Sequence, residues 1–177
     1  MAQTAAEQGA VLLNYARVEA LLRNDSDFVD GVVAVDLESG TRHEWRAKVV
    51  LNCTGPFADT VRRFDNPDAP AMISPSTGVH IVLPKEFLPT GTVIMVPHTT
   101  DGRVLFAIPW HNCVVVGTTD NPVEEINLEP KPTREEVDFI LENARRYLEK
   151  PPELIDVLSV FSGIRPLVKA GGGDNTA

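Results

Sequence analysis

One histidine and one arginine stand inside stretches of this sequence that are otherwise suited to packing. His80 lies in the run Gly78-Val79-His80-Ile81-Val82, and Arg165 lies in Gly163-Ile164-Arg165-Pro166-Leu167. Imidazole has an unperturbed pKa of about 6.5, so it can serve as a general base near neutral pH. A guanidinium in an apolar strand needs an anionic partner, because burying it unpaired is costly. These two residues are the first candidates for a functional site.

Both candidates also have purely structural interpretations. His80 can be an ordinary core or surface histidine with no part in catalysis. The anionic partner of Arg165 can be a substrate phosphate or carboxylate, or it can be an aspartate or glutamate of the protein itself. The residues alone leave both alternatives open.

Two further runs combine a strand end with small or polar groups. Asn52-Cys53-Thr54-Gly55 joins an apolar stretch to an expected helix, so its backbone amides can meet a ribose or phosphate group, or it is a plain turn that needs Gly55. In Gly117-Thr118-Thr119-Asp120 we expect Asp120 to cap a turn without a functional role. Arg103 and Trp110, near an expected hairpin, are also interpreted as structural.

Hydrophobic patterning predicts the elements that position these runs. In the first part of the chain we expect a helix end at 5–9, a strand at 10–15 extended by 17–22, a β-hairpin of 32–37 and 42–47, a buried strand at 49–51, and a helix from Pro56 to about Phe64. A crossing loop over 65–76 with three prolines suggests a domain boundary.

Beyond that loop the pattern is mostly that of β-strands. Strands are expected at 79–83, 92–96, 103–108 and 113–116, with turns at Asp101-Gly102 and His111-Asn112, and a final strand pair at 157–161 and 164–168. Thr133 and Glu136 have the spacing of a capping box, which predicts the start of a helix with one apolar face.

Composition narrows the class of protein. The chain has 177 residues and a net charge of −9, which argues against nucleic-acid binding. No apolar run approaches the roughly 18 residues of a membrane span, and the N-terminus lacks the features of a signal peptide, so we expect a cytoplasmic protein. Cys53 and Cys113 are expected to be buried free thiols, and no residue spacing suggests a metal site.

Taken in order, these runs resemble the FAD-dependent, respiratory glycerol-3-phosphate dehydrogenases. The resemblance covers nearly the whole chain and depends on the ordered combination of motifs. The matching runs are Leu13-Asn14-Tyr15-Ala16-Arg17-Val18, residues 52–59, Pro75-Ser76-Thr77-Gly78-Val79-His80-Ile81-Val82, residues 101–106, Ile108-Pro109-Trp110, Gly117-Thr118-Thr119-Asp120 and Ser162-Gly163-Ile164-Arg165-Pro166-Leu167.

The resemblance implies an α+β or α/β fold. Residues 1–70 would be part of a Rossmann-like FAD domain with an inserted β-hairpin at about 29–46, and residues 71–177 part of a substrate domain with a mainly antiparallel sheet flanked by helices. It also implies oxidation of glycerol 3-phosphate to dihydroxyacetone phosphate, with electrons passed to a quinone and a peripheral contact with the inner membrane made by regions outside this chain.

The resemblance further implies roles for single residues. His80 would help to take the proton from the C2 hydroxyl of the substrate, and Arg165 would contact the substrate, most plausibly at its phosphate. Val18, Thr54 and Gly55 would lie beside FAD.

This sequence also departs from the family pattern. Cys53 stands where the family has alanine, and neither the Gly-rich pyrophosphate loop nor the C-terminal segment with a substrate-contacting lysine is present. We therefore expect an internal piece of a larger protein that, in isolation, binds FAD poorly and turns over no substrate.

Two other functions are compatible with the residues. A related flavin-dependent amino-acid or hydroxy-acid oxidase would use Arg165 to bind a carboxylate. A non-catalytic, β-rich binding domain would need no cofactor.

Overall fold

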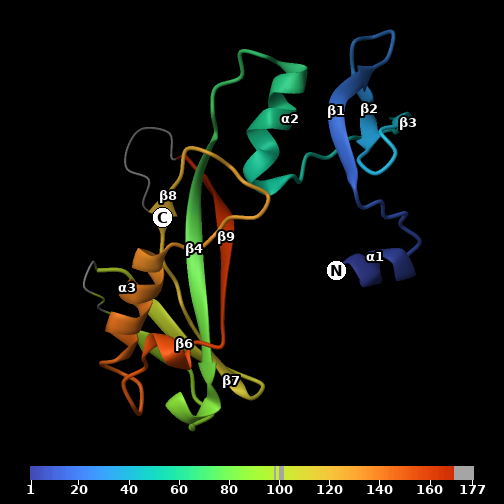
Figure 1. Ribbon diagram of the computed structural model, residues 1–177. Coiled ribbons are helices and arrows are strands. Elements are labelled where there is room, and N and C mark those ends of the chain that lie inside the picture. Colours follow the sequence, from blue (N-terminus) through green and yellow to red (C-terminus); the bar gives the residue numbers. More distant parts are fainter. Residues whose placement is uncertain (98, 100–101, 170–177) are drawn as a thin grey trace. The chain divides into compact units, whose positions relative to one another are not determined.

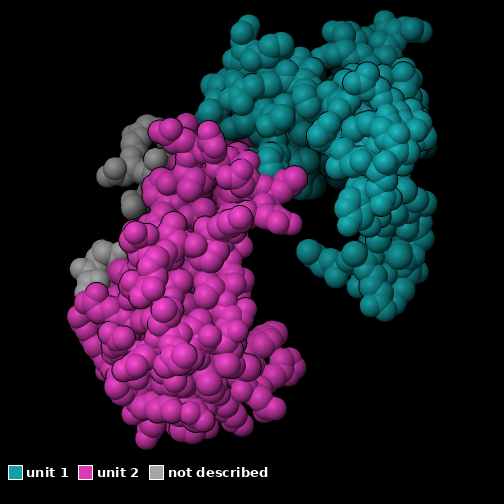
Figure 2. All heavy atoms as spheres, in the orientation of Figure 1, with its two compact units in different colours: residues 1–71 teal, residues 72–177 magenta. Residues whose placement is uncertain are grey.

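The computed structural model describes residues 1–97, 99 and 102–169 of the chain. The backbone divides into two compact units, Met1–Ala71 and Met72–Ala177, which are coloured separately in Figure 2. His80 and Arg165 belong to the second unit, whereas Val18, Thr54 and Gly55 belong to the first.

The first unit contains an antiparallel three-stranded sheet. Strands β1 (Ala16–Arg23), β2 (Val29–Asp36) and β3 (Arg42–Arg46) lie in the order β1-β2-β3, so β2 and β3 form an antiparallel hairpin (Figure 1). The short helix α1 (Ala2–Glu7) precedes the sheet, and the 3-10 turn η1 (Gly55–Phe57) leads into α2 (Ala58–Asp65) after it. An ion pair between Arg23 and Asp65 joins β1 to α2.

Two predicted strands of the first unit are wrong. Residues 10–15 and 49–51 have no strand conformation, and Val49 and Leu51 are 68% and 79% exposed. A strand needs a neighbour for its backbone hydrogen bonds. Apart from one bond from the Leu37 N–H to the Tyr15 carbonyl oxygen, no strand among the described residues pairs with either stretch. The helix predicted from Pro56 is confirmed, with Pro56 in the first turn where its missing N–H costs nothing.

The second unit is built on one antiparallel sheet. Its long central strand β4 (Ile73–Pro84) pairs with β7 (Cys113–Gly117), β8 (Asn121–Pro122) and β9 (Ser159–Val168) (Figure 1). Beyond β7 lie β6 (Leu105–Trp110) and β5 (Ile94–Val96). The short 3-10 turn η2 (Lys85–Phe87) follows β4 directly, and the 3-10 turn η3 (Leu154–Asp156) precedes β9.

The core lies between one face of this sheet and helix α3 (Arg134–Ala144). Side chains alternate along a strand, so the odd-numbered residues of β4 face the same side. Val79, Ile81 and Leu83 are fully buried there, together with Ile140 of α3. The predicted capping box is confirmed, because Thr133 accepts the Glu136 N–H and Glu136 accepts the Thr133 N–H.

Three further details of the structure differ from prediction. The expected strand pair at 157–161 and 164–168 is one continuous strand, β9, because Gly163 stays in register opposite Gly78 and forms no turn. Strand β4 begins at Ile73, inside the predicted loop. The two cysteines are free, but Cys53 is exposed and Cys113 only half-buried, since the strand expected around Cys53 does not form.

The mixture of helices and antiparallel sheets confirms the α+β class. No pair of strands in the described residues is parallel, so the Rossmann-like part of the fold stays a prediction. Of the predicted turns, His111-Asn112 is present, with His111 at φ 53°, while Asp101 lies outside the described residues. Within the described residues, no helix has the length and apolar character needed to cross a membrane.

Candidate functional site

The sheet face opposite the core carries His80 and Arg165. Even-numbered residues of β4 point to this face, and residues directly opposite in neighbouring strands share it. His80 lies opposite Phe161 of β9 and Gly117 of β7, while Gly78 lies opposite Gly163. His80, Arg165 and Phe161 line one hollow of about 230 Å³. The structure therefore brings the two predicted residues together.

The imidazole of His80 is held on two sides. Its ring stacks on Phe161 with the centroids 5.0 Å apart and the planes inclined by 8°. On the other side it fills the space above Gly117, where a Cβ atom would lie 2.4 Å from His80 Cδ2. Only glycine leaves room for the ring in this position, so its orientation is fixed by packing.

The environment of His80 favours its neutral form. Burial is the larger cause that lowers the pKa of the imidazole below its ordinary 6.5, and the positive charge of Arg165 lowers it further. A general base must be unprotonated to accept a proton, so both effects increase the fraction of competent base near neutral pH.

Replacing Arg165 by glutamine is expected to raise the pKa of His80. The substitution removes the nearby cation but leaves the burial of the ring, so the pKa should rise without fully returning to 6.5. An NMR titration of the His80 ring protons measures this shift. A His80 midpoint that stays constant or falls would contradict the electrostatic coupling.

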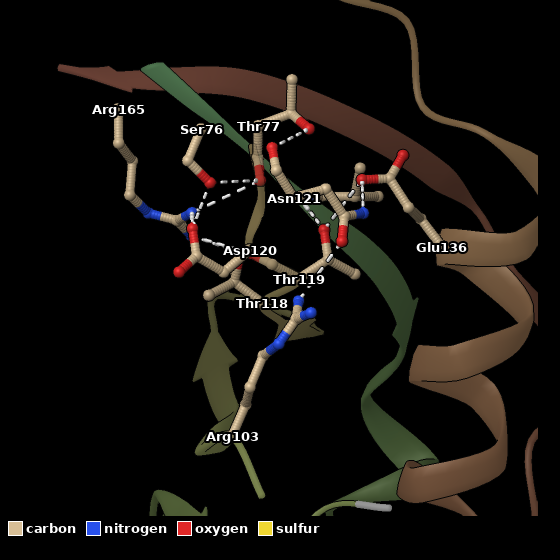
Figure 3. Close-up of polar contacts among 10 residues, drawn as sticks. Ser76, Thr77, Arg103, Thr118, Thr119, Asp120, Asn121, Glu136 and Arg165 are labelled. Carbon is tan, nitrogen blue, oxygen red and sulfur yellow. Dashed lines mark hydrogen bonds and ion pairs between the residues drawn. The ribbon is translucent and has the colours of Figure 1, made fainter. Parts of the chain in front are cut away.

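Arg165 has its anionic partner within the protein. Its Nη1 lies 3.0 Å from Asp120 Oδ1, and its Nη2 donates to Thr118 Oγ1 at 2.7 Å and to the carbonyl oxygen of Thr119 at 3.1 Å (Figure 3). The guanidinium lies close over Gly78, where a Cβ would stand 2.3 Å from Nη2. The structural alternative for the partner of Arg165 is thus realised, although the side chain still borders the hollow.

The ion pair with Asp120 differs from the expectation from sequence, in which Asp120 only caps a turn. Asp120 and Arg165 are 45 residues apart, and they meet because both β8 and β9 pair with the beginning of β4. The only signal in the sequence was an acidic residue at a strand end, which does not specify a partner.

The segment that carries Asp120 is anchored from the core side. Thr119 Oγ1 accepts the N–H of Val79 at 2.9 Å and donates to Glu136 Oε1 at 3.0 Å, and Asn121 Nδ2 donates to the same oxygen at 2.8 Å (Figure 3). Burial alone would raise the pKa of Glu136, but hydrogen bonds from Thr133, Asn121 and Thr119 outweigh it and leave the pKa lowered. The charged carboxylate therefore holds the segment against α3.

The predicted cofactor residues lie in the first unit. Val18 is a half-buried residue of β1, next to a register irregularity at Val18 and Ala20. Thr54 and Gly55 form the turn before α2, in which Asn52 Oδ1 accepts both the N–H and the hydroxyl of Thr54. Gly55 has φ +56°, and a Cβ there would meet no atom within 4 Å, so this turn is open to an approaching group.

The remaining residues of interest have different surroundings. Arg103 lies 3.5 Å from Asn121 Oδ1 and 6.0 Å from the centre of the Phe139 ring, which agrees with a structural role. Trp110 is 62% exposed and lines an apolar hollow of about 540 Å³ with Val82, Val115 and Phe161. This hollow adjoins the site through Phe161, which borders both.

Known proteins resemble this chain along most of its length. A glycerol-3-phosphate dehydrogenase from Schizosaccharomyces pombe is 39% identical over 178 residues, which are 96% of this chain and 27% of that protein. One from Mesocricetus auratus is 43% identical over 175 residues, which are 95% of this chain and 24% of that protein. Both are described as mitochondrial. The chain thus spans about a quarter of the length of these relatives.

A solved structure agrees with these relatives. The crystal structure of the glycerol-3-phosphate dehydrogenase from Bacillus halodurans, complexed with FAD, matches with a TM-score of 0.82 and 35% identity over 93% of this chain and 33% of that one. These comparisons confirm the resemblance to glycerol-3-phosphate dehydrogenases. The family model for FAD dependent oxidoreductases, DAO, matches residues 1–175, and the chain therefore belongs to the family of FAD-dependent oxidoreductases.

Proposed function

We propose that the intact protein containing this chain oxidises glycerol 3-phosphate to dihydroxyacetone phosphate with FAD. The observation that carries the proposal is a hollow lined by both an imidazole with a lowered pKa and a fixed guanidinium. A secondary alcohol needs a base for its hydroxyl proton, and a phosphate monoester needs a cation. The relatives described above are named for this substrate.

In this proposal the two residues divide the work. Arg165 binds the phosphate. Because the phosphate is anchored, the carbon that reacts is held in a fixed orientation. An imidazole nitrogen of His80 accepts the proton of the C2 hydroxyl as the C2–H bond breaks. When bound, FAD supplies the acceptor for the hydride, which no side chain can provide.

The cofactor would be held in part by Val18, Thr54 and Gly55. The turn fits such a role because Gly55 leaves its backbone uncovered, while the Thr54 N–H is already used by Asn52 and is not available. We further propose a quinone as electron acceptor and a peripheral contact with the inner membrane. Both follow from the resemblance to the respiratory enzymes.

A substrate comparison on the intact protein tests this function. We expect reduction of an artificial dye with glycerol 3-phosphate, and at least about a hundredfold lower kcat/KM with lactate or with amino acids, because these lack the phosphate. Preference for a carboxylated substrate would instead support an amino-acid or hydroxy-acid oxidase. Protein without bound flavin and without any turnover would support a non-catalytic binding domain.

A further inference from the structure

Asp120 contacts Arg165 at a place where the proposed reaction calls for a substrate anion. Its Oδ1 lies 3.0 Å from Arg165 Nη1 and also accepts the hydroxyl of Ser76. Figure 3 shows these three side chains pointing toward one another from separate elements. Ser76 and Arg165 stand directly opposite in the pairing of β4 with β9, so the carboxylate bridges the two strands.

The terminal nitrogens of Arg165 are largely occupied by the protein. Nη1 faces Asp120, with the carbonyl oxygen of Thr77 at 3.5 Å, and Nη2 faces Thr118 Oγ1 and the carbonyl oxygen of Thr119. A guanidinium has five N–H groups. Among the described residues the hydrogen bonds of Arg165 all come from Nη1 and Nη2, so the Nε–H group is the one left for a ligand.

We propose that Asp120 is the positioning residue for Arg165, an inference that rests on the proposed function. Asp120 fixes the plane of the guanidinium over Gly78, so that the phosphate meets a cation that is already oriented. An arginine has several rotatable bonds, and a side chain fixed in advance loses less freedom when the ligand binds.

The position of Asp120 is itself determined by the fold. Its neighbours Thr119 and Asn121 both donate to Glu136 Oε1, and the Glu136 side chain is buried at the start of α3. The hydrogen bond from Val79 to Thr119 ties the same segment to β4. Asp120 is therefore held from the core side while its carboxylate faces Arg165.

The test uses the intact flavoenzyme and three variants. Asp120→Ala removes the carboxylate, Asp120→Asn keeps an oxygen acceptor without the charge, and Glu124→Ala removes an exposed carboxylate four residues away as a matched control. For Asp120→Ala we expect the KM for glycerol 3-phosphate to rise about tenfold or more while kcat changes less than about threefold, because orientation of the phosphate is lost and the base is not. Asp120→Asn should restore part of the affinity, and Glu124→Ala should leave both constants unchanged.

Other outcomes overturn the inference in distinguishable ways. A KM that falls in Asp120→Ala would mean that the carboxylate competes with the substrate for Arg165. An equal loss of kcat and kcat/KM in both Asp120 variants, with a lowered melting temperature, would mean that Asp120 only supports the fold. If wild-type enzyme itself fails to turn over glycerol 3-phosphate, the proposed function fails and this inference falls with it.

Discussion

Gly78→Ala is expected to raise the KM for glycerol 3-phosphate in the intact enzyme by about tenfold to a hundredfold. The added Cβ would lie 2.3 Å from Nη2, 2.7 Å from Cζ and 2.8 Å from Nη1 of Arg165, distances that no real contact tolerates. Gly78 is in the middle of β4 and pairs with β9, while the residues before and after it pair with β8 and β7 on the other side. The strand is therefore held, and the guanidinium must move. Steady-state kinetics with the phosphorylated substrate measure the change.

Gly91→Ala provides a matched control for Gly78→Ala. Gly91 is an exposed residue before β5 that does not line the hollow, and a Cβ at this position would meet no atom within 4 Å. The control should therefore keep the KM within about threefold of wild type, since neither functional side chain is touched. Equal effects of the two alanines would show that the position of the guanidinium does not determine substrate affinity.

Strands were predicted correctly from the sequence where a neighbouring strand is found among the described residues. In strands β4 to β7 and helix α3, the spacing of apolar residues matches the face that is buried, because α3 covers the odd-numbered side of β4. Residues 49–51 have an equally apolar pattern, but no described strand pairs with them. Local hydrophobicity reports the tendency to be buried and not the presence of a neighbour.

The candidate site could be predicted in its residue types but not in its connections. The apolar surroundings of His80 and Arg165 marked both residues as unusual, and their shared hollow depends only on the alternation of side chains once the strand pairing is known. The pairing itself joins residues more than 80 positions apart. For this reason the contacts of Arg165 with Asp120 and Thr118 were beyond sequence reasoning, as was the link through Glu136.

Loss of the imidazole is expected to have the largest effect on turnover. His80→Ala removes the proposed acceptor of the hydroxyl proton, so kcat of the intact enzyme should fall by about 10² to 10⁴, the usual contribution of a positioned general base. The KM should change much less, because Arg165 and its contacts with Asp120 and Thr118 do not involve the ring. Stopped-flow measurement of flavin bleaching by glycerol 3-phosphate isolates the chemical step from the later electron transfer.

Two further variants test whether the effect on turnover depends on the His80 ring and on its position. His43→Ala removes an imidazole that stacks on Trp45 on an exposed strand, and it should leave flavin reduction unchanged. Gly117→Ala keeps His80 but places a Cβ 2.4 Å from its Cδ2, so it should slow the same step by displacing the ring. If position rather than mere presence of the imidazole matters, Gly117→Ala will resemble His80→Ala in kcat while retaining the histidine. Flavin reduction at near-normal rates in both variants would remove His80 from the mechanism, since a base that can be deleted or shifted without effect does not accept the proton.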